Sequence, residues 1–213
     1  MHAYVLLDRS GSMQTLWVEA LSSINAYAKG LADKTDGRSV DSHITLAVFD
    51  GQEGLQFDVL RKKVPALHWE KVTDREATPR GMTPLLDALG RVVAMAESDN
   101  PDKAVIVVMT DGQENASREV TREGVKAALD RVRAKGWEVV FLGANFDNIS
   151  DADAVGVGGA KQMAMASGTI GASMERMAMK SRAYAASAAP IEFDEADRKV
   201  AQEAKVKNTT KKH

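Results

Sequence analysis

Three short segments of the chain carry oxygen-bearing side chains that could bind one metal ion together. The residues concerned are Asp8, Ser10, Ser12, Thr83 and Asp111. The first three follow a short apolar stretch at two-residue spacing, Thr83 precedes Pro84, and Asp111 follows a long apolar run. Carboxylate and hydroxyl oxygens without thiolate or imidazole suit Mg²⁺ or Mn²⁺ far better than Zn²⁺. The spacing therefore predicts a divalent-metal site.

Each segment also has an ordinary structural explanation when it is taken alone. Asp8 and Ser10 could cap the helix that follows them. Thr83 could be the N-cap of a helix that begins at Pro84. Asp111 could be a simple turn residue. The coincidence of all three at the ends of predicted strands and helices favours a shared site.

The elements that must position these residues alternate between strands and helices. Strands are expected at residues 3–8, 43–49, 55–63, 104–110 and 137–142. Apolar residues at helical spacing predict helices at 14–33, 84–97, 120–135 and 170–185. This alternation predicts a doubly wound α/β fold with a mostly parallel central sheet, one antiparallel edge strand and helices on both faces. In such sheets ligands bind outside the carboxyl ends of the strands.

The chain is expected to have three parts. These are a core domain over residues 1–160, a helical extension over 161–193 and a charged, flexible tail over 194–213. The net charge of −2 gives no basic field that would favour nucleic acid or a membrane surface. There is no cysteine, no signal peptide is recognised, and the longest apolar run is too short to span a bilayer. We therefore expect a cytoplasmic protein.

The three segments resemble the metal-ion-dependent adhesion site (MIDAS) of von Willebrand factor A (vWA) domains, in the small intracellular type of bacteria and phages. The motifs are Asp-x-Ser-x-Ser after the first strand, Thr-Pro-Leu before a helix and Thr-Asp-Gly after the fourth strand. Their order and spacing match over roughly residues 2–160. The resemblance implies a Rossmann-like fold in which Ser10, Ser12 and Thr83 contact the metal. Asp8 and Asp111 would act directly or through water.

Four further residues are predicted to rim this site. They are Arg9, Arg80, Glu114 and Asn145. The two arginines flank the metal segments and could meet an acidic partner. A solvated, locally paired or turn role stays open for all four.

The resemblance implies a non-enzymatic protein-binding module. Its Mg²⁺ or Mn²⁺ would be completed by an Asp or Glu of a partner protein, since a hydroxyl-rich set of ligands leaves the ion electrophilic. Intracellular family members often work with AAA+ ATPases or in stress systems, so a partner of that class is expected, with neither nucleic acid nor membrane. Two alternatives stay open: a metal-dependent hydrolase or phosphotransferase, and a scaffold that keeps the site for stability alone.

Overall fold

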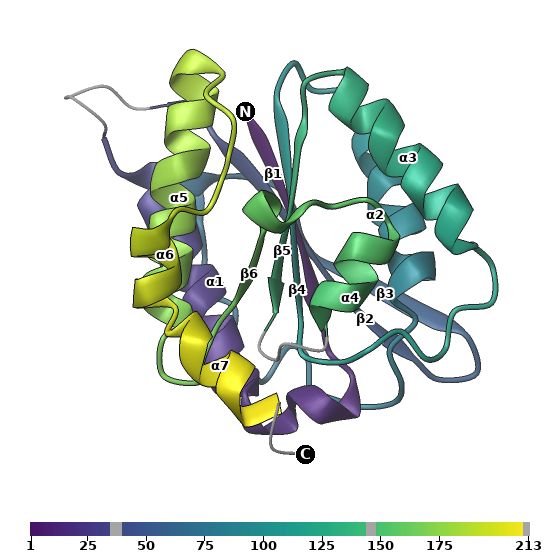
Figure 1. The fold of residues 1–213 in the computed structure, drawn as a ribbon. Helices are drawn as coiled ribbons and strands as arrows, with labels where there is room; N and C mark the ends of the chain where they lie inside the picture. Colours follow the sequence, from purple (N-terminus) through teal and green to yellow (C-terminus); the bar gives the residue numbers. More distant parts are fainter. Residues whose placement is uncertain (35–39, 144–147, 211–213) are drawn as a thin grey trace.

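A six-stranded sheet forms the centre of the protein in this computed structural model, which describes residues 1–34, 40–143 and 148–210 (Figure 1). The strands lie in the order β3-β2-β1-β4-β5-β6. They are β1 (His2–Asp8), β2 (His43–Gly51), β3 (Leu55–Pro65), β4 (Ala104–Thr110), β5 (Glu138–Gly143) and β6 (Gln162–Ala164). Only β3 runs antiparallel to its neighbour in this sheet. The predicted α/β fold with one antiparallel edge strand is confirmed.

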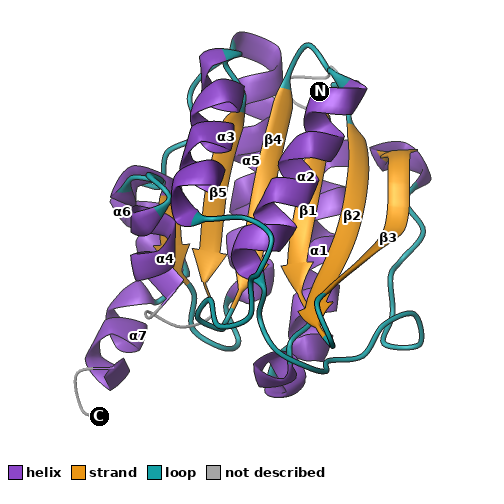
Figure 2. Cartoon of the chain, turned by 90° about the vertical axis from the view of Figure 1, so that its right-hand side faces the viewer, coloured by secondary structure: helices purple, strands orange, loops and turns teal. Residues whose placement is uncertain are grey.

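Helices cover both faces of the sheet (Figure 2). The first five are α1 (Trp17–Ala32), α2 (Leu85–Asp99), α3 (Arg122–Ala134), α4 (Asn148–Ala154) and α5 (Ile170–Ser187). Alternate residues of β1 face two separate cores: Val5 packs with α1 and α5, whereas Leu6 packs with α2 and α3. Burial on both faces explains why β1 and β4 read as continuous apolar runs. None of the described helices is long and apolar enough to cross a membrane.

The strand order reverses between β1 and β4. Both strands are parallel and aligned, with Leu7 opposite Met109, so they end at the same edge of the sheet. After β1 the chain passes through α1 to β2 on one side, and after β4 it passes through α3 to β5 on the other. This is the place where open α/β sheets bind ligands. Asp8 and Asp111 therefore lie at the reversal point.

The C-terminal part differs from the prediction. The sheet continues past residue 160 into β6, and the expected flexible tail contains α6 (Glu195–Val200) and α7 (Glu203–Thr210). Asp194 caps α6, because its side chain accepts a hydrogen bond from the backbone of Asp197. Asp197 is itself buried and forms ion pairs with Arg176 and Lys180 of α5. Capping and ion pairs hold this segment together with isolated buried apolar side chains, Ala201 and Val206, so hydrophobic periodicity did not reveal it.

Candidate metal centre

Asp8 is fully buried at the end of β1. Its Oδ1 accepts a hydrogen bond of 2.7 Å from the backbone N–H of Ser10, and its Oδ2 accepts one of 2.6 Å from the hydroxyl of Thr110. Burial raises the pKa of Asp8 to about 6, although both hydrogen bonds favour the ionised form. Both hydrogen bonds come from uncharged donors, a backbone amide and a hydroxyl.

A chain of hydroxyls joins the first segment to Asp111. The Ser12 hydroxyl donates to Asp111 Oδ1 at 2.6 Å, and the Ser10 and Ser12 hydroxyl oxygens are 3.0 Å apart. Because the Ser12 hydroxyl gives its one proton to Asp111, it can only accept a hydrogen bond from Ser10. Burial raises the pKa of Asp111 as well. Ser10 is buried and Ser12 is exposed, so the site reaches solvent at Ser12.

The surroundings of Gly112 show that oxygens from all three segments converge. A β-carbon at this position would lie 2.8 Å from Thr83 Oγ1, 3.3 Å from Ser12 Oγ and 3.6 Å from Asp8 Oδ2. Any residue other than glycine would fill the space between these oxygens. The structure thus brings the five predicted metal-binding residues to one place.

The loop after β4 holds Thr83 in position. The backbone N–H of Thr83 donates to Asn115 Oδ1 at 2.9 Å, and the N–H of Asn115 donates to the Thr83 carbonyl at 3.2 Å. Glu114, predicted to rim the site, instead accepts a hydrogen bond of 2.9 Å from the N–H of Leu86 in the first turn of α2. Its carboxylate also accepts a hydrogen bond from the hydroxyl of Ser117. Glu114 therefore ties the loop to α2 and does not point free into solvent.

The two arginines of the predicted rim differ in exposure. Arg9 is 5% exposed, and it donates to Asp50 Oδ2 and Asp58 Oδ2, both at 2.6 Å. It therefore fastens the metal segment to β2 and β3. The side chain of Arg80 is 43% exposed and donates through Nε to the same oxygen of Asp50, at 3.3 Å. Asn145 lies outside the described residues.

Two residues at this edge were missed by the sequence reasoning. Thr110 orients Asp8 through its hydroxyl. Asp50 accepts hydrogen bonds from Arg9 and Arg80 through Oδ2, whereas its Oδ1 has no partner within the described part of the chain. Both stand at the ends of strands, as the predicted ligands do. Asp50 directly follows the strand expected at residues 43–49, so its position at a strand end was the overlooked signal.

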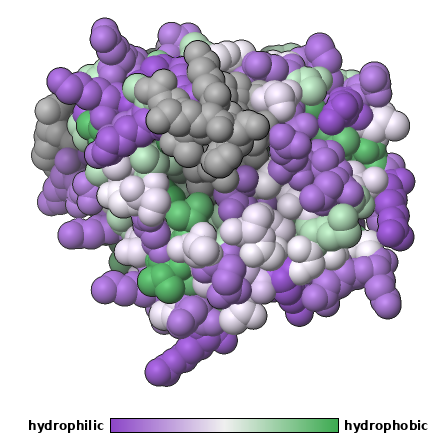
Figure 3. Space-filling model, turned by 60° about the horizontal axis from the view of Figure 1, so that its bottom comes forward, coloured by the Kyte–Doolittle hydropathy of each residue, from purple (hydrophilic) through white to green (hydrophobic). Residues whose placement is uncertain are grey.

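The donor set fits a divalent cation. Two buried carboxyls and three hydroxyls supply hard oxygens, and a cation beside them would stabilise the ionised form of both acids. Within the described ranges, no group of three or more His, Cys, Asp or Glu side chains gathers to hold a metal. The hydroxyls of Ser10, Ser12 and Thr83 are therefore essential to the candidate site. The end of the molecule where the parallel strands finish, brought forward in Figure 3, is mostly hydrophilic over its described surface.

Several solved structures are similar in fold. Proximal thread matrix protein 1 (PTMP1) from the mussel byssus matches with a TM-score of 0.58 and 18% identity over 83% of this chain and 46% of that one. The manganese-loaded TRAP protein of Plasmodium vivax matches with a TM-score of 0.54 and 16% identity, over 81% of this chain and 70% of that one. The pilus adhesin SpaC from Lactobacillus rhamnosus GG matches with a TM-score of 0.60 and 13% identity, over 84% of this chain and 29% of that one. This chain thus spans about half the length of the mussel protein, which has also been solved with a zinc-occupied MIDAS motif.

The family comparison covers most of the chain. No curated protein matches. The family model of the von Willebrand factor type A domain matches residues 3–179, from the start of β1 into α5. That range contains all three segments of the candidate metal centre and all six strands except His2 at the start of β1. The chain therefore belongs to the von Willebrand factor type A domain family.

Proposed function

We propose that the protein is a non-enzymatic module that binds a partner protein through a divalent metal ion. The observation that carries this proposal is the convergence of Thr83, Ser12 and Asp8 oxygens around the space beside Gly112. The manganese-loaded Plasmodium protein and the zinc-occupied MIDAS motif of the mussel protein support a divalent metal as the ligand in this proposal.

In this proposal Ser10, Ser12 and Thr83 hold Mg²⁺ or Mn²⁺, and Asp8 and Asp111 balance its charge. When bound, the ion supplies a Lewis-acidic position that attracts a carboxylate from an Asp or Glu of the partner. Neutral hydroxyl ligands leave that position strongly electrophilic. Ser12 is exposed, so the partner approaches from that side.

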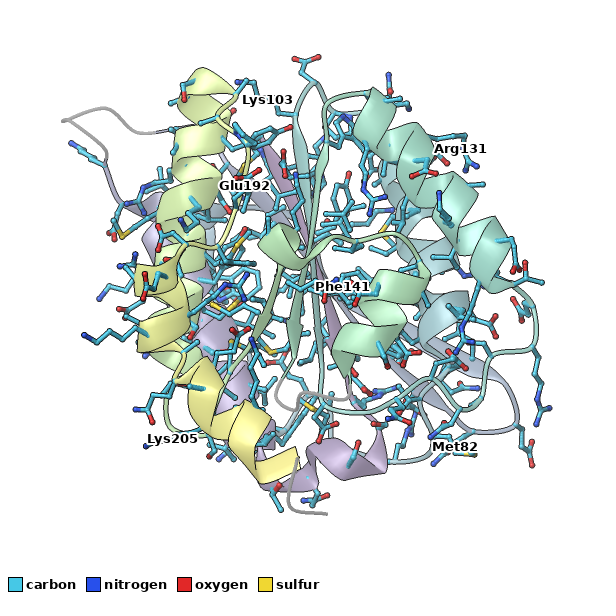
Figure 4. All side chains as sticks on the ribbon, in the orientation of Figure 1. Met82, Lys103, Arg131, Phe141, Glu192 and Lys205 are labelled. Carbon is cyan, nitrogen blue, oxygen red and sulfur yellow. The ribbon has the colours of Figure 1, made fainter. Side chains whose placement is uncertain are left out.

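The surface beside Thr83 suits an acidic partner with some apolar character. Arg80 is held by a single hydrogen bond through Nε, and its terminal nitrogens have no partner among the described residues. Its guanidinium can therefore receive a second carboxylate. Met82 is 52% exposed and points away from the body of the protein (Figure 4). We propose that Arg80 and Met82 contact the partner around the metal.

Hydrolysis or phosphoryl transfer receives less support from this site. The hydrogen-bond partners found for Asp8 and Asp111 are hydroxyls and a backbone amide. Among the described residues no Lys or His forms a hydrogen bond or ion pair with either carboxylate, and hydrolytic metal sites commonly use such a group beside the ion. The cytoplasm as the location, and an AAA+ ATPase or stress-system protein as the partner, remain predictions that the capture experiment below addresses.

The proposal is tested by capture of a partner from the native host. Protein captured with Mg²⁺ is compared with protein captured in EDTA and with the Asp111→Ala variant. Asp130→Ala is the matched control, because Asp130 is an exposed carboxylate on α3. We expect the same captured protein with the wild type and Asp130→Ala, and its loss in EDTA and in Asp111→Ala. Capture that persists in EDTA would contradict the proposal.

A further inference from the structure

A groove of about 680 Å³ runs between α1 and the segment that follows β3. One wall is a face of α1, and the other belongs to residues 66–74, which include a short helix at Ala66–His68. The α1 side chains that line the groove are Val18, Leu21, Ser22, Asn25, Ala26, Lys29 and Ala32. This wall extends along the whole of α1, which is about 24 Å long at 1.5 Å per residue. We call this feature the α1 groove.

The α1 groove carries the two most exposed large apolar side chains of the described residues. Val18 and Leu67 are each 71% exposed, compared with 57% for Met179. They come from opposite walls of the groove. Apolar side chains gathered at a surface hollow are typical of protein-binding sites. The groove is therefore a site where burial by a partner would be favourable.

The walls of the groove are held together by a side chain within it. Asn25 donates to the Val72 carbonyl at 2.9 Å, and its Oδ1 accepts hydrogen bonds from the Val72 N–H and from Trp69 Nε1 at 2.9 and 3.0 Å. The segment opposite α1 is thus fixed to it before any partner arrives. A preformed groove loses less conformational entropy on binding.

The charges lining the groove indicate the chemistry of its occupant. Lys29 and Lys71 line it, and neither forms an ion pair with any residue that the structure describes. Asp74 is the single acidic residue of the lining. An occupant with carboxylates would pair with the lysines, whereas a basic one would be repelled. The length of the groove and its exposed apolar rim favour a polypeptide segment over a small molecule.

We propose that the α1 groove binds an apolar segment of a partner protein that carries acidic residues. This binding is separate from the metal centre and does not rest on the function proposed above. The residues that carry it are Val18 and Leu67 for apolar contact and Lys29 and Lys71 for charge.

The test uses a dye-labelled amphipathic helical peptide as long as α1, with leucines on one face and glutamates on the other. A second peptide has lysine in place of each glutamate, and dodecanoate represents a small amphipathic acid. Fluorescence anisotropy measures binding to the full chain in EDTA. We expect the acidic peptide to bind more tightly than the basic one. Leu67→Asp should weaken it at least about tenfold.

Two matched controls separate the groove from general effects. Met179→Asp also places a carboxylate on an exposed apolar position, but on α5, and should bind as the wild type does. The Lys29→Glu and Lys71→Glu double variant should reverse the preference between the peptides, whereas Lys199→Glu on α6 should not. Equal binding of both peptides, no effect of Leu67→Asp, or binding of dodecanoate alone would overturn the proposal. If the protein self-associated and Leu67→Asp abolished that association, the occupant of the α1 groove would be a second copy of this chain, and the proposal would be overturned.

Discussion

The two ends of β1 bury polar groups in different ways. At the amino end, His2 Nε2 lies 2.8 Å from Thr45 Oγ1, and the Tyr4 hydroxyl donates to Asp99 at 2.9 Å. Lys103, which precedes β4, marks this end in Figure 4. At the carboxyl end, Asp8 and Asp111 receive hydrogen bonds from neutral groups, and oxygens of Asp8 and Thr83 lie close together beside Gly112.

The difference lies in which groups keep their charge near neutral pH. Burial lowers the pKa of His2 to about 4 and raises the pKa of Tyr4, so both are neutral. At the other end burial raises the pKa of Asp8 only to about 6, which leaves it ionised at pH 7 and costs stability. The amino end is therefore a completed structural network, whereas we expect the carboxyl end to gain stability when a cation binds.

The largest expected effect follows from closing the space beside Gly112. In Gly112→Ala the new methyl group would meet Thr83 Oγ1 at 2.8 Å. We expect Mg²⁺ affinity to fall by more than about 100-fold, beyond the usual effect of removing an outer hydrogen-bond partner. Isothermal titration calorimetry measures the affinity. Gly171→Ala, whose methyl group meets no atom within 4 Å, is the control and should bind Mg²⁺ normally.

The next effect comes from the hydroxyl that orients Asp8. Thr110→Val keeps the side-chain shape but removes the 2.6 Å hydrogen bond to Asp8 Oδ2. We expect Mg²⁺ affinity to fall by about 10- to 100-fold. Thr45→Val makes the same change at the amino end, where it removes the contact with His2. If Thr45→Val weakened Mg²⁺ binding as much as Thr110→Val, the contrast between the two ends would be wrong.

The raised pKa of Asp8 predicts that Mg²⁺ stabilises the protein more as pH rises. The folded protein holds this proton more tightly than the unfolded chain does, so the metal-free protein loses stability as pH increases from about 4 through about 6. Mg²⁺ displaces the proton, and its affinity should be about tenfold lower at pH 5 than at pH 7. Thermal unfolding with and without Mg²⁺ measures the change in Tm. An equal Mg²⁺ effect at both pH values would contradict this explanation.

The smallest expected effect lies at the amino end. Tyr4→Phe removes the hydrogen bond to Asp99, and we expect the free energy of unfolding to fall by about 1 kcal/mol. Mg²⁺ affinity should not change, because the hydrogen bond between Tyr4 and Asp99 lies toward the amino end of β1, whereas Asp8 is its last residue. Chemical denaturation and calorimetry on the same samples test both statements. A tenfold loss of Mg²⁺ affinity would show that the two ends are coupled.

The sequence predicted the central strands well because β1, β4 and β5 are buried along their whole length. The apolar run before Asp111 is β4, within the bounds expected for it, and the predicted strand ends led directly to Asp8 and Asp111. Site residues recognised by type and position at strand ends could therefore be found without a structure. Whether they bind metal stays a prediction.

Residues whose partners are distant in sequence could not be placed in this way. Arg9 pairs with Asp50 and Asp58, which are 41 and 49 residues away, so the sequence did not show that it is buried. Glu114 became a cap for α2 only because the loop after β4 folds over that helix. The ion pairs of Asp197 with α5 likewise hold α6 against the domain, where the sequence predicted a flexible tail.

The most direct test of the metal centre is a calorimetric titration of the metal-free protein with Mn²⁺. Wild type and Asp130→Ala are compared with Asp8→Ala and Asp111→Ala, and circular dichroism confirms that all four are folded. We predict one bound ion per chain in the first two proteins and loss of binding in the other two. Unchanged Mn²⁺ affinity in folded Asp8→Ala and Asp111→Ala would show that these oxygens do not form a metal site.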